Sequence, residues 1–189
     1  RLNPKENPLG TPSGKLEIYS STIAGFNYDD CPGHPVWQEP LEWLGSKLTV
    51  KYPLHLITNQ PKTRLHSQYD NGGYSKEHKI NDREPVTINP IDASNRGITD
   101  GDIVRLFNDR GACLAGAQVS DDVMPGVIQL STGAWFDPLE PGTPGSLDVH
   151  GNPNVLTIDK GTSSLAQGPS AMTALVDVER FKGAPPPVK

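Results

Sequence analysis

Three short β-rich runs follow one another between residues 103 and 130, and tight turns separate them. The runs are Ile103–Phe107, Ala112–Val119 and Val127–Leu130. Between them, Asn108–Gly111 and Val123–Gly126 contain the Asn, Asp, Pro and Gly residues that reverse a chain. Short strands at this spacing indicate a small β-barrel or a β-sandwich.

Glycine and proline residues also occur throughout the rest of the chain. The 189 residues include 19 Gly and 19 Pro, spread without a period, and the hydrophobic fraction is 34%. This composition excludes collagen and low-complexity sequence and favours a turn-rich, mainly β domain with long loops. Further strands are expected at Tyr52–Ile57 and Thr173–Glu179. A short helix is expected at Asn89–Gly97, which begins with a capping Asn and a Pro and ends with Gly.

The two ends of the chain differ from its body. Residues 1–50 predict an irregular lead-in segment from the preceding part of a larger chain, in which only Lys15–Tyr19 alternates like a strand. We expect a compact domain over residues 51–182 and an exposed Pro-rich tail over 183–189. The sequence starts with Arg1 and has neither an initiator Met nor a signal peptide, so we expect a piece of a longer polypeptide.

Charge and cysteine content exclude several function classes. The formal net charge is −5 with both signs interspersed, and no basic block predicts nucleic-acid binding. No apolar run is long enough to predict a membrane span. Cys31 and Cys113 lie far apart and have no metal-ligand spacing. Buried or idle thiols are the default interpretation, and a disulfide is the alternative.

A polar segment, residues 57–68, follows the expected strand Tyr52–Ile57. It brings hydroxyl, amide, guanidinium and imidazole groups into one short turn. Such a set of groups can bind a ligand with phosphates and a heterocycle. Arg64 offers a planar fork of donors for phosphate. Asn59, Gln60 and the distant Asn154 have the donors and acceptors to match the edge of a heterocycle, and Thr58 and Ser67 add neutral hydroxyls.

Each of these residues also has a purely structural interpretation. A polar turn in an arbitrary protein is usually a surface loop, and an isolated Arg64 would usually be a solvated or paired surface group. His66 alone would more often be structural, and Asn154 alone could be a turn residue. The other four histidines share no metal-ligand spacing, so we assign no site to His34, His55, His78 and His150.

Many ordered stretches of residues 10–182 resemble one protein family. The chain is similar there to the C-terminal portion of bacterial S-oxide and N-oxide reductases: the dimethyl sulfoxide, trimethylamine N-oxide and biotin sulfoxide reductases of the molybdopterin oxidoreductase superfamily. The matching stretches are Tyr28–Pro32, Thr58–Gln68, Arg83–Pro85, Ile88–Pro90, Gly101–Gly111, Pro125–Ile128, Gly133–Pro138, Gly151–Thr157, Gly161–Ser163 and Leu165–Gln167.

The resemblance implies a mainly β fold, a six-stranded double-psi β-barrel with short helices and long loops. It implies that residues 51–182 bind molybdenum bis(molybdopterin guanine dinucleotide), shared with upstream domains. By the same resemblance, the cofactor contacts are Thr58, Asn59, Gln60, Pro61, Arg64, His66, Ser67, Asn154, Ala171 and Met172. Relatives carry a Gly-Gln pair at the last two positions, so any contact by Ala171 and Met172 would use the backbone. The serine that ligates molybdenum lies upstream in this family, so we expect no metal ligand and no catalytic residue here.

For the whole enzyme, the resemblance implies oxygen-atom removal from a small-molecule S-oxide or N-oxide, and the isolated fragment is expected to be inactive. Expected partners are upstream domains of the same polypeptide and that substrate, with a cytochrome as a candidate electron donor. A periplasmic location is implied, with the cytoplasm as the alternative. Two other functions stay open: a double-psi barrel assembly module without cofactor, and the equivalent domain of a formate dehydrogenase or nitrate reductase.

Overall fold

The computed structural model describes residues 3–189, apart from the side chain of Ala171. The chain forms two compact units. The lead-in unit holds the residues up to Glu39 together with Lys160–Pro169, and the barrel unit holds Pro40–Asp159 with Ser170–Lys189. The domain boundaries expected at residues 50 and 182 stay predictions.

The barrel unit consists of six strands joined by loops and short helices. Its strands are β1 (Leu54–Ile57), β2 (Pro85–Ile88), β3 (Ile103–Phe107), β4 (Ala112–Val119), β5 (Val127–Leu130) and β6 (Ala174–Arg180). Its short helices are η1 (Lys47–Val50), α2 (Gly73–Lys76), α3 (Pro90–Ser94), η2 (Pro153–Val155) and η3 (Ala171–Thr173), and α1 (Ser21–Ala24) belongs to the lead-in unit.

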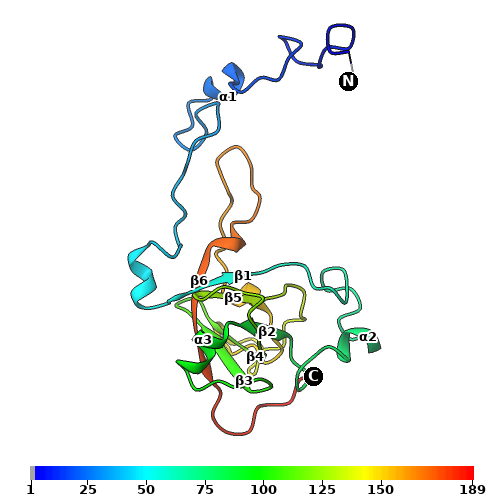
Figure 1. The fold of residues 1–189 in the computed structure, drawn as a ribbon, viewed down its shortest axis with the longest axis vertical. Coiled ribbons are helices and arrows are strands. Elements are labelled where there is room, and N and C mark those ends of the chain that lie inside the picture. Colours follow the sequence, from blue (N-terminus) through cyan, green and yellow to red (C-terminus); the bar gives the residue numbers. More distant parts are fainter. Residues whose placement is uncertain (1–2) are drawn as a thin grey trace. The chain divides into compact units, whose positions relative to one another are not determined.

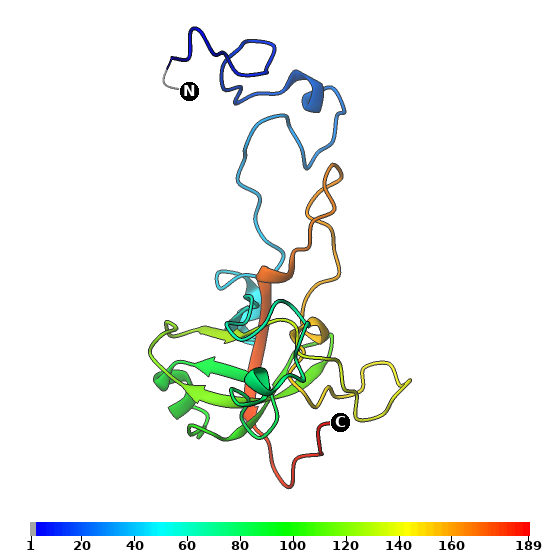
Figure 2. The ribbon, with the colours of Figure 1, turned by 90° about the vertical axis from the view of Figure 1, so that its right-hand side faces the viewer.

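The strands close into a barrel in the order β1-β5-β2-β4-β3-β6 (Figure 1, Figure 2). β1 pairs with β5 and β2 pairs with β4 in parallel, and every other neighbouring pair is antiparallel. Closure removes every free sheet edge, which stabilises a sheet of such short strands. The predicted mainly β, six-stranded double-psi barrel with short helices and long loops is confirmed, and the sandwich is excluded.

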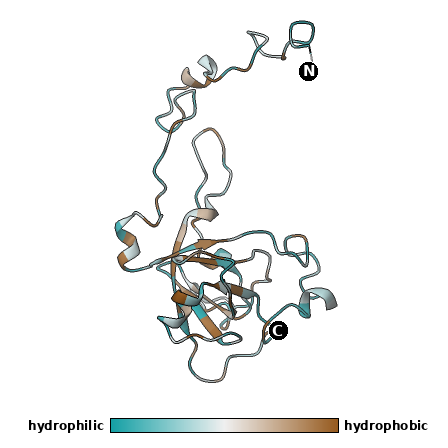
Figure 3. Ribbon diagram, in the orientation of Figure 1, coloured by the Kyte–Doolittle hydropathy of each residue, from teal (hydrophilic) through white to brown (hydrophobic). Residues whose placement is uncertain are grey.

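The hydrophobic core fills the inside of the barrel. Along the strands, buried and partly exposed residues alternate, because successive side chains point to opposite faces. Figure 3 shows brown, hydrophobic segments on the strands. Each buried Val, Leu or Ile contributes about 1.5–3 kcal/mol to stability. The inward residues include Leu54, Leu56, Val86, Ile88, Val104, Leu106, Ile128, Leu130, Ala174 and Val176.

Helix α3 confirms the predicted helix, in shortened form. Asn89 caps it by accepting a hydrogen bond from the Ile91 backbone at 3.0 Å, and Pro90 occupies the first turn. The helix ends at Ser94, and Gly97 has the expected left-handed backbone with φ of 63°. The cap and the glycine therefore set the two ends of the segment.

Three expectations about the ends and the cysteines have clear outcomes. The strand expected at Lys15–Tyr19 is wrong: these residues form no strand, and Leu16 is 81% exposed, so neither face of the segment is buried. Cys31 and Cys113 are free thiols. The Pro-rich tail is largely exposed, but the Pro186 carbonyl accepts a hydrogen bond from Arg83.

None of the helices among residues 3–189 has the length and apolar character required to cross a membrane.

Candidate cofactor site

Three loops meet at one end of the barrel. Residues 58–67 follow β1, residues 131–135 follow β5, and η3 precedes β6. Because β1 is parallel to β5 and antiparallel to β6, their connecting loops lie at the same end, which we call the loop end. Two contacts join them: the Thr132 N–H donates to the Asn59 carbonyl at 2.9 Å, and the Thr58 hydroxyl lies 3.2 Å from the Met172 sulfur.

Asn154 also lies at the loop end. The turn between β3 and β4 is there, since Phe107 pairs with Asp177 near the start of β6. Asn108 in this turn donates to the Leu156 carbonyl at 2.8 Å and so fastens η2 to it. The Asn154 residue is exposed, and its side chain has no partner among residues 3–189. The structure thus brings Asn154 to the same end of the barrel as the loop of residues 58–67.

The loop of residues 58–67 is held in shape by its own side chains. Gln60 Oε1 accepts from the His66 backbone N–H at 3.1 Å, so Gln60 Nε2 is the donor to His66 Nδ1 at 2.8 Å. This assignment leaves the His66 proton on Nε2. His66 has a left-handed backbone with φ of 50°. Gln60 and His66 therefore fix each other and keep one imidazole N–H for another partner.

A glycine allows the loop after β5 to approach this segment closely. A Cβ built on Gly133 would lie 2.0 Å from the His66 carbonyl oxygen, and φ of Gly133 is 95°. Both facts exclude a larger residue without movement of the backbone. Two residues on, Trp135 Nε1 donates to the Ser67 carbonyl at 2.8 Å. The loops after β1 and β5 are thus packed backbone against backbone.

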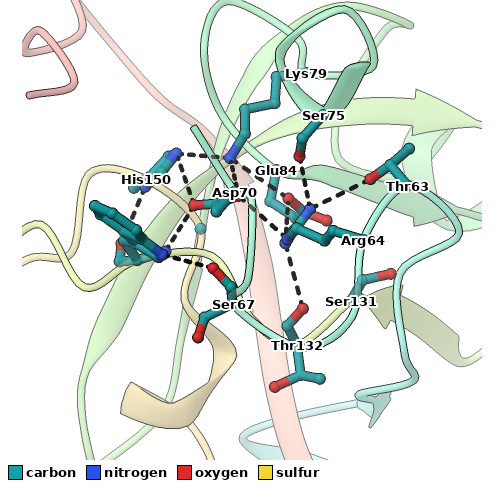
Figure 4. A network of polar contacts seen from close by, with 12 residues as sticks. Thr63, Arg64, Ser67, Asp70, Ser75, Lys79, Glu84, Ser131, Thr132 and His150 are labelled. Atoms are coloured by element: carbon teal, nitrogen blue, oxygen red, sulfur yellow. Dashed lines mark hydrogen bonds and ion pairs between the residues drawn. The ribbon is translucent and has the colours of Figure 1, made fainter. Parts of the chain in front are cut away.

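Arg64 points inward, and its side chain is only 1% exposed. Its Nη2 lies 3.0 Å from Glu84 Oε2 and 3.3 Å from the Thr132 carbonyl, while Nη1 donates to Ser75 Oγ at 3.2 Å (Figure 4). Its Nε forms an ion pair with Asp70 at 3.2 Å but is not aligned for a hydrogen bond. The guanidinium is therefore committed inside the protein, and its predicted contact with a cofactor stays a prediction.

Lys79 and His150 extend the same network. Lys79 Nζ lies 2.7 Å from Asp70 Oδ1 and 2.7 Å from His150 Nε2 (Figure 4). The other imidazole nitrogen, Nδ1, lies 3.0 Å from the Trp135 carbonyl and donates to it, so Nε2 accepts from the lysine. Burial and the Lys79 charge lower the pKa of His150, which keeps the imidazole neutral near pH 7.

The two carboxylates of the network respond differently to burial. Burial raises the pKa of Glu84, although the charges of Arg64 and Lys79 oppose this. Burial also acts to raise the pKa of Asp70, but hydrogen bonds from Lys79 and the Trp135 N–H bring it below its usual value. With His150 neutral, two cations face two carboxylates, so the buried network carries no net charge when both are ionised.

Sequence reasoning did not identify four members of this network. The missed residues are Asp70, Lys79, Glu84 and His150. Of these four residues, Glu84 is the one that the sequence could have indicated, because it belongs to the Arg83–Pro85 stretch that matches the family. His150 lacks metal-ligand spacing in the sequence, and its two ring nitrogens lie within hydrogen-bond distance of Lys79 and the Trp135 carbonyl.

A groove lies between the loop after β1 and the outer wall of the barrel. Its volume is about 340 Å³, within the range of about 300–1,000 Å³ that is usual for ligand sites. The loop side is formed by Asn59 and by Pro61–Arg64, and the wall side by β2, β4 and β5. Within the described residues, no cluster of three or more His, Cys, Asp or Glu side chains could hold a metal ion.

Comparison with known proteins identifies the family. Residues 54–175 match the "Molydopterin dinucleotide binding domain" family. The chain belongs to this family. It is 54% identical over 98% of its length to the dimethyl sulfoxide/trimethylamine N-oxide reductase of Cereibacter sphaeroides. It is 55% identical over 97% of its length to trimethylamine-N-oxide reductase 1 of Escherichia coli strain K12. The chain spans only 22% of each of these relatives.

The fold is shared more widely than the sequence. Acetylene hydratase from Pelobacter acetylenicus superposes on 93% of this chain with a TM-score of 0.73, at 22% identity and over 24% of its own length. At this identity the likeness concerns the fold alone. It supports a common barrel scaffold.

The residues at the loop end fit a molybdopterin dinucleotide. Phosphates need cations or N–H donors, and the Lys62 ammonium at the groove has no partner among residues 3–189. A pterin or purine needs donors and acceptors side by side. The His66 N–H is one donor, and the Asn59 amide, which donates to the Gln60 carbonyl at 2.9 Å, has a second N–H for another partner. The chemistry of this donor set therefore agrees with the family.

Proposed function

We propose that this chain is the C-terminal cofactor-binding domain of a molybdenum reductase of S-oxides or N-oxides. In this proposal it holds molybdenum bis(molybdopterin guanine dinucleotide) together with upstream domains of the same polypeptide. The observation that carries the proposal is the identity of 54% to a dimethyl sulfoxide/trimethylamine N-oxide reductase over nearly the whole chain. The barrel's polar loop end supports it, because three loops from distant parts of the sequence converge there.

The contribution of this chain is to bind and orient. When bound, the cofactor supplies the two-electron oxygen-atom transfer chemistry. Thr58, Asn59 and Gln60 present hydroxyl and amide groups at the end of β1, and the ring of Pro61 fixes its own φ and restricts Gln60 before it. His66 would donate to the dinucleotide through Nε2, and Ser67 follows it in the same loop. These groups would hold a dinucleotide by its polar edges.

Two further segments would complete the cofactor site. Asn154 offers an amide on η2 that has no partner among residues 3–189, and η3 contributes the backbone of Ala171 and Met172. The Met172 sulfur already meets the Thr58 hydroxyl, which brings η3 against the start of the loop after β1. We propose that this chain supplies neither the molybdenum ligand nor a catalytic residue, so residues 1–189 alone should not turn over substrate.

The proposal is tested by the composition of the purified full-length protein. Molybdenum measured by mass spectrometry and guanine nucleotide released by acid should be present at about one metal per two nucleotides, because two pterins share one metal. A full-length protein that folds and binds neither molybdenum nor molybdopterin would refute the proposal. A gene without upstream cofactor domains would refute it equally, and would favour an assembly module.

Partners and compartment belong to the same proposal. The upstream domains would cover the loop end, a small S-oxide or N-oxide would be the substrate, and a cytochrome would donate electrons. The relatives' names support the substrate class, since they specify dimethyl sulfoxide and trimethylamine N-oxide. We propose a periplasmic location, with the cytoplasm as the alternative. Cell fractionation followed by immunoblotting distinguishes the two compartments.

A further inference from the structure

A closed ring of hydrogen bonds joins four distant parts of the chain at the loop end. Arg110, in the turn between β3 and β4, donates through Nε to the Leu156 carbonyl at 2.8 Å and through Nη2 to Glu42 Oε2 at 3.0 Å. The same Glu42 oxygen accepts from the Leu175 backbone N–H at 2.6 Å. Asn108 Nδ2 completes the ring, because it donates to the Leu175 carbonyl at 3.1 Å and to the Leu156 carbonyl at 2.8 Å. We call these five residues the Glu42–Arg110 ring.

Side chains of the ring continue a strand pairing beyond the point where the strand stops. β6 pairs with β3 as far as Asp177, which lies opposite Phe107, the last residue of β3. Leu175 lies two residues earlier, so its N–H and C=O point to the same side, past the end of β3. The Glu42 carboxylate and the Asn108 amide bind these two backbone groups. The ring therefore fixes the first residues of β6, which η3 directly precedes.

The pair of Glu42 and Arg110 has the geometry of a fixed joint. The two terminal nitrogens of the guanidinium meet the two oxygens of the carboxylate, at 2.5 Å and 3.0 Å. The Glu42 side chain is 8% exposed and the Arg110 side chain 30% exposed. Two parallel charge-assisted hydrogen bonds fix the direction of both groups as well as their separation. A lysine at position 110 would keep the charge but lose this planar fork.

The ring adjoins two segments that carry predicted cofactor contacts. Asn154 of η2 lies two residues before Leu156, and Met172 of η3 lies three residues before Leu175. The turn between β3 and β4 also approaches η2 closely, since a Cβ built on Gly111 would lie 2.9 Å from a carbonyl oxygen of η2. The ring thus sets the spacing between η2 and η3, and it leaves the Asn154 residue exposed.

We propose that Glu42 and Arg110 are positioning residues for the cofactor. They would hold η2 and η3 at a fixed spacing, so that the Asn154 amide and the backbone at Met172 meet the dinucleotide together. Glu42 and Arg110 bind each other and the backbone, and they would not touch the cofactor. This inference rests on the proposed function and goes beyond it, because it makes cofactor retention depend on an ion pair outside the contact residues.

The Arg110→Lys variant of the full-length, cofactor-loaded protein tests the proposal. It keeps the charge but loses the fork and the Nε donor to the Leu156 carbonyl. Molybdenum retained through successive gel filtrations gives the rate of cofactor release, at a temperature where circular dichroism shows the variant folded. Release should be about tenfold faster, as expected for the loss of one charge-assisted hydrogen bond. Glu42→Gln is the second variant and should act alike, because it keeps an oxygen for the Leu175 N–H but not the bidentate pair.

Arg96→Lys is the matched control. Arg96 is also partly buried, and its Nη2 pairs with Asp177 at 2.9 Å. It directly follows α3, which follows β2, and β2 runs antiparallel to β5. Arg96 therefore extends from the end of the barrel opposite the loop end. Urea denaturation should show a comparable loss of stability in Arg96→Lys and Arg110→Lys, whereas Arg96→Lys should release cofactor at the wild-type rate.

Two further measurements separate positioning from a general loss of stability. In full-length protein from a host that cannot synthesise molybdopterin, hydrogen exchange in Arg110→Lys should rise in residues 153–156 and 171–175 and stay unchanged in residues 58–67. The second measurement is a double-mutant cycle. If the ring acts through Asn154, Arg110→Lys should accelerate release less in an Asn154→Ala background than in the wild type.

Three results would overturn the positioning role. They are equal release rates in Arg110→Lys and Arg96→Lys, exchange that rises as much in residues 58–67 as in residues 153–156, and effects of Arg110→Lys and Asn154→Ala that multiply in full. Failure of the proposed function gives a different result: a full-length protein that contains neither molybdenum nor molybdopterin. A protein that contains both, but whose Arg110→Lys variant releases them at the wild-type rate, loses the positioning role alone.

Discussion

Arg64 Nη2 lies 3.0 Å from Glu84 Oε2, and both side chains are at most 5% exposed. This ion pair joins the loop after β1 to the residue just before β2. Arg64 is therefore better placed to hold the loop in position than to meet a ligand in solution. Its side chain connects the polar groups of the loop end to the barrel.

Replacement of Arg64 by Ala should strongly destabilise the protein. Asp70 and Glu84 would lose a cation inside the protein, and breaking a buried pair in this way costs about 3–5 kcal/mol. Urea denaturation of the full-length protein measures the change. Arg105→Ala is the control, because its pair with Glu179 is exposed and worth about 1 kcal/mol or less.

The same variant should retain less cofactor, because the loop of residues 58–67 loses its anchor. Molybdenum content after gel filtration measures retention, at a temperature where the variant is still folded. Unchanged retention in Arg64→Ala would remove Arg64 from the cofactor site. A stability loss no larger than that of Arg105→Ala would contradict the account of a buried network.

Substitution of Gly133 by Ala should displace the loop after β1. The new Cβ would overlap the His66 carbonyl oxygen, and relief of such a contact costs about 1–3 kcal/mol. Gly142→Ala is a matched control, since φ of Gly142 is also positive but nothing lies within 4 Å of its Cβ position. The temperature of thermal unfolding and the retention of molybdenum should both fall more in Gly133→Ala than in Gly142→Ala. Equal effects of the two variants would exclude the backbone contact as the cause.

Substitution of Gln60 by Ala should affect binding more than stability. Gln60 fixes the backbone and ring of His66, but both residues are exposed, so the stability change should stay within about 0.5 kcal/mol. Cofactor should dissociate faster, because the imidazole is no longer oriented. Gln68→Ala is the control: Gln68 is exposed in the same segment, and its side chain has no partner among residues 3–189. Similar retention in both variants would argue against an oriented His66.

Asp148 should make the stability pH-dependent. Burial raises its pKa from 3.8 to about 6, even though one carboxylate oxygen accepts from the backbone N–H groups of His150, Gly151 and Asn152. The folded state then holds the proton more tightly than the unfolded state. The contribution of Asp148 to stability is thus fully present below pH 4 and is lost as the pH rises through about 6.

The Asp148→Asn variant isolates this contribution. The wild type minus variant difference in free energy of unfolding should fall by roughly 3 kcal/mol between pH 4 and pH 7, from 1.36 kcal/mol per pKa unit. Asn keeps an oxygen for the backbone N–H groups, so the comparison removes mainly the titration. A difference that does not change with pH would show that Asp148 ionises normally.

Local sequence signals predicted the parts of the fold that local contacts form. The hairpin of β3 and β4 has its turn residues between two β-rich runs, and α3 carries its own cap and stop signals. Strand β2 was not predicted as a strand. It is four residues long and begins with a proline, and its pairing partners β4 and β5 lie further along the chain. Such a strand is determined by tertiary contacts rather than by propensity.

The candidate site could likewise be predicted only in part from the sequence. The polar composition of residues 58–67 was readable in the sequence, but the inward direction of Arg64 was not. That direction depends on Asp70 and Glu84, and the network ends at His150, far along the chain. No periodic pattern links residues that a closed barrel brings together from separate loops.

Hydrogen exchange tests the central claim most directly, since that claim locates the cofactor at the loop end of the barrel. Exchange of the full-length protein is compared with and without bound cofactor, by mass spectrometry of the same peptides. The account predicts slower exchange in residues 58–67, 131–133 and 153–155 on loading, and unchanged exchange in the exposed turn 141–145. Equal exchange of residues 58–67 in the two states would contradict it.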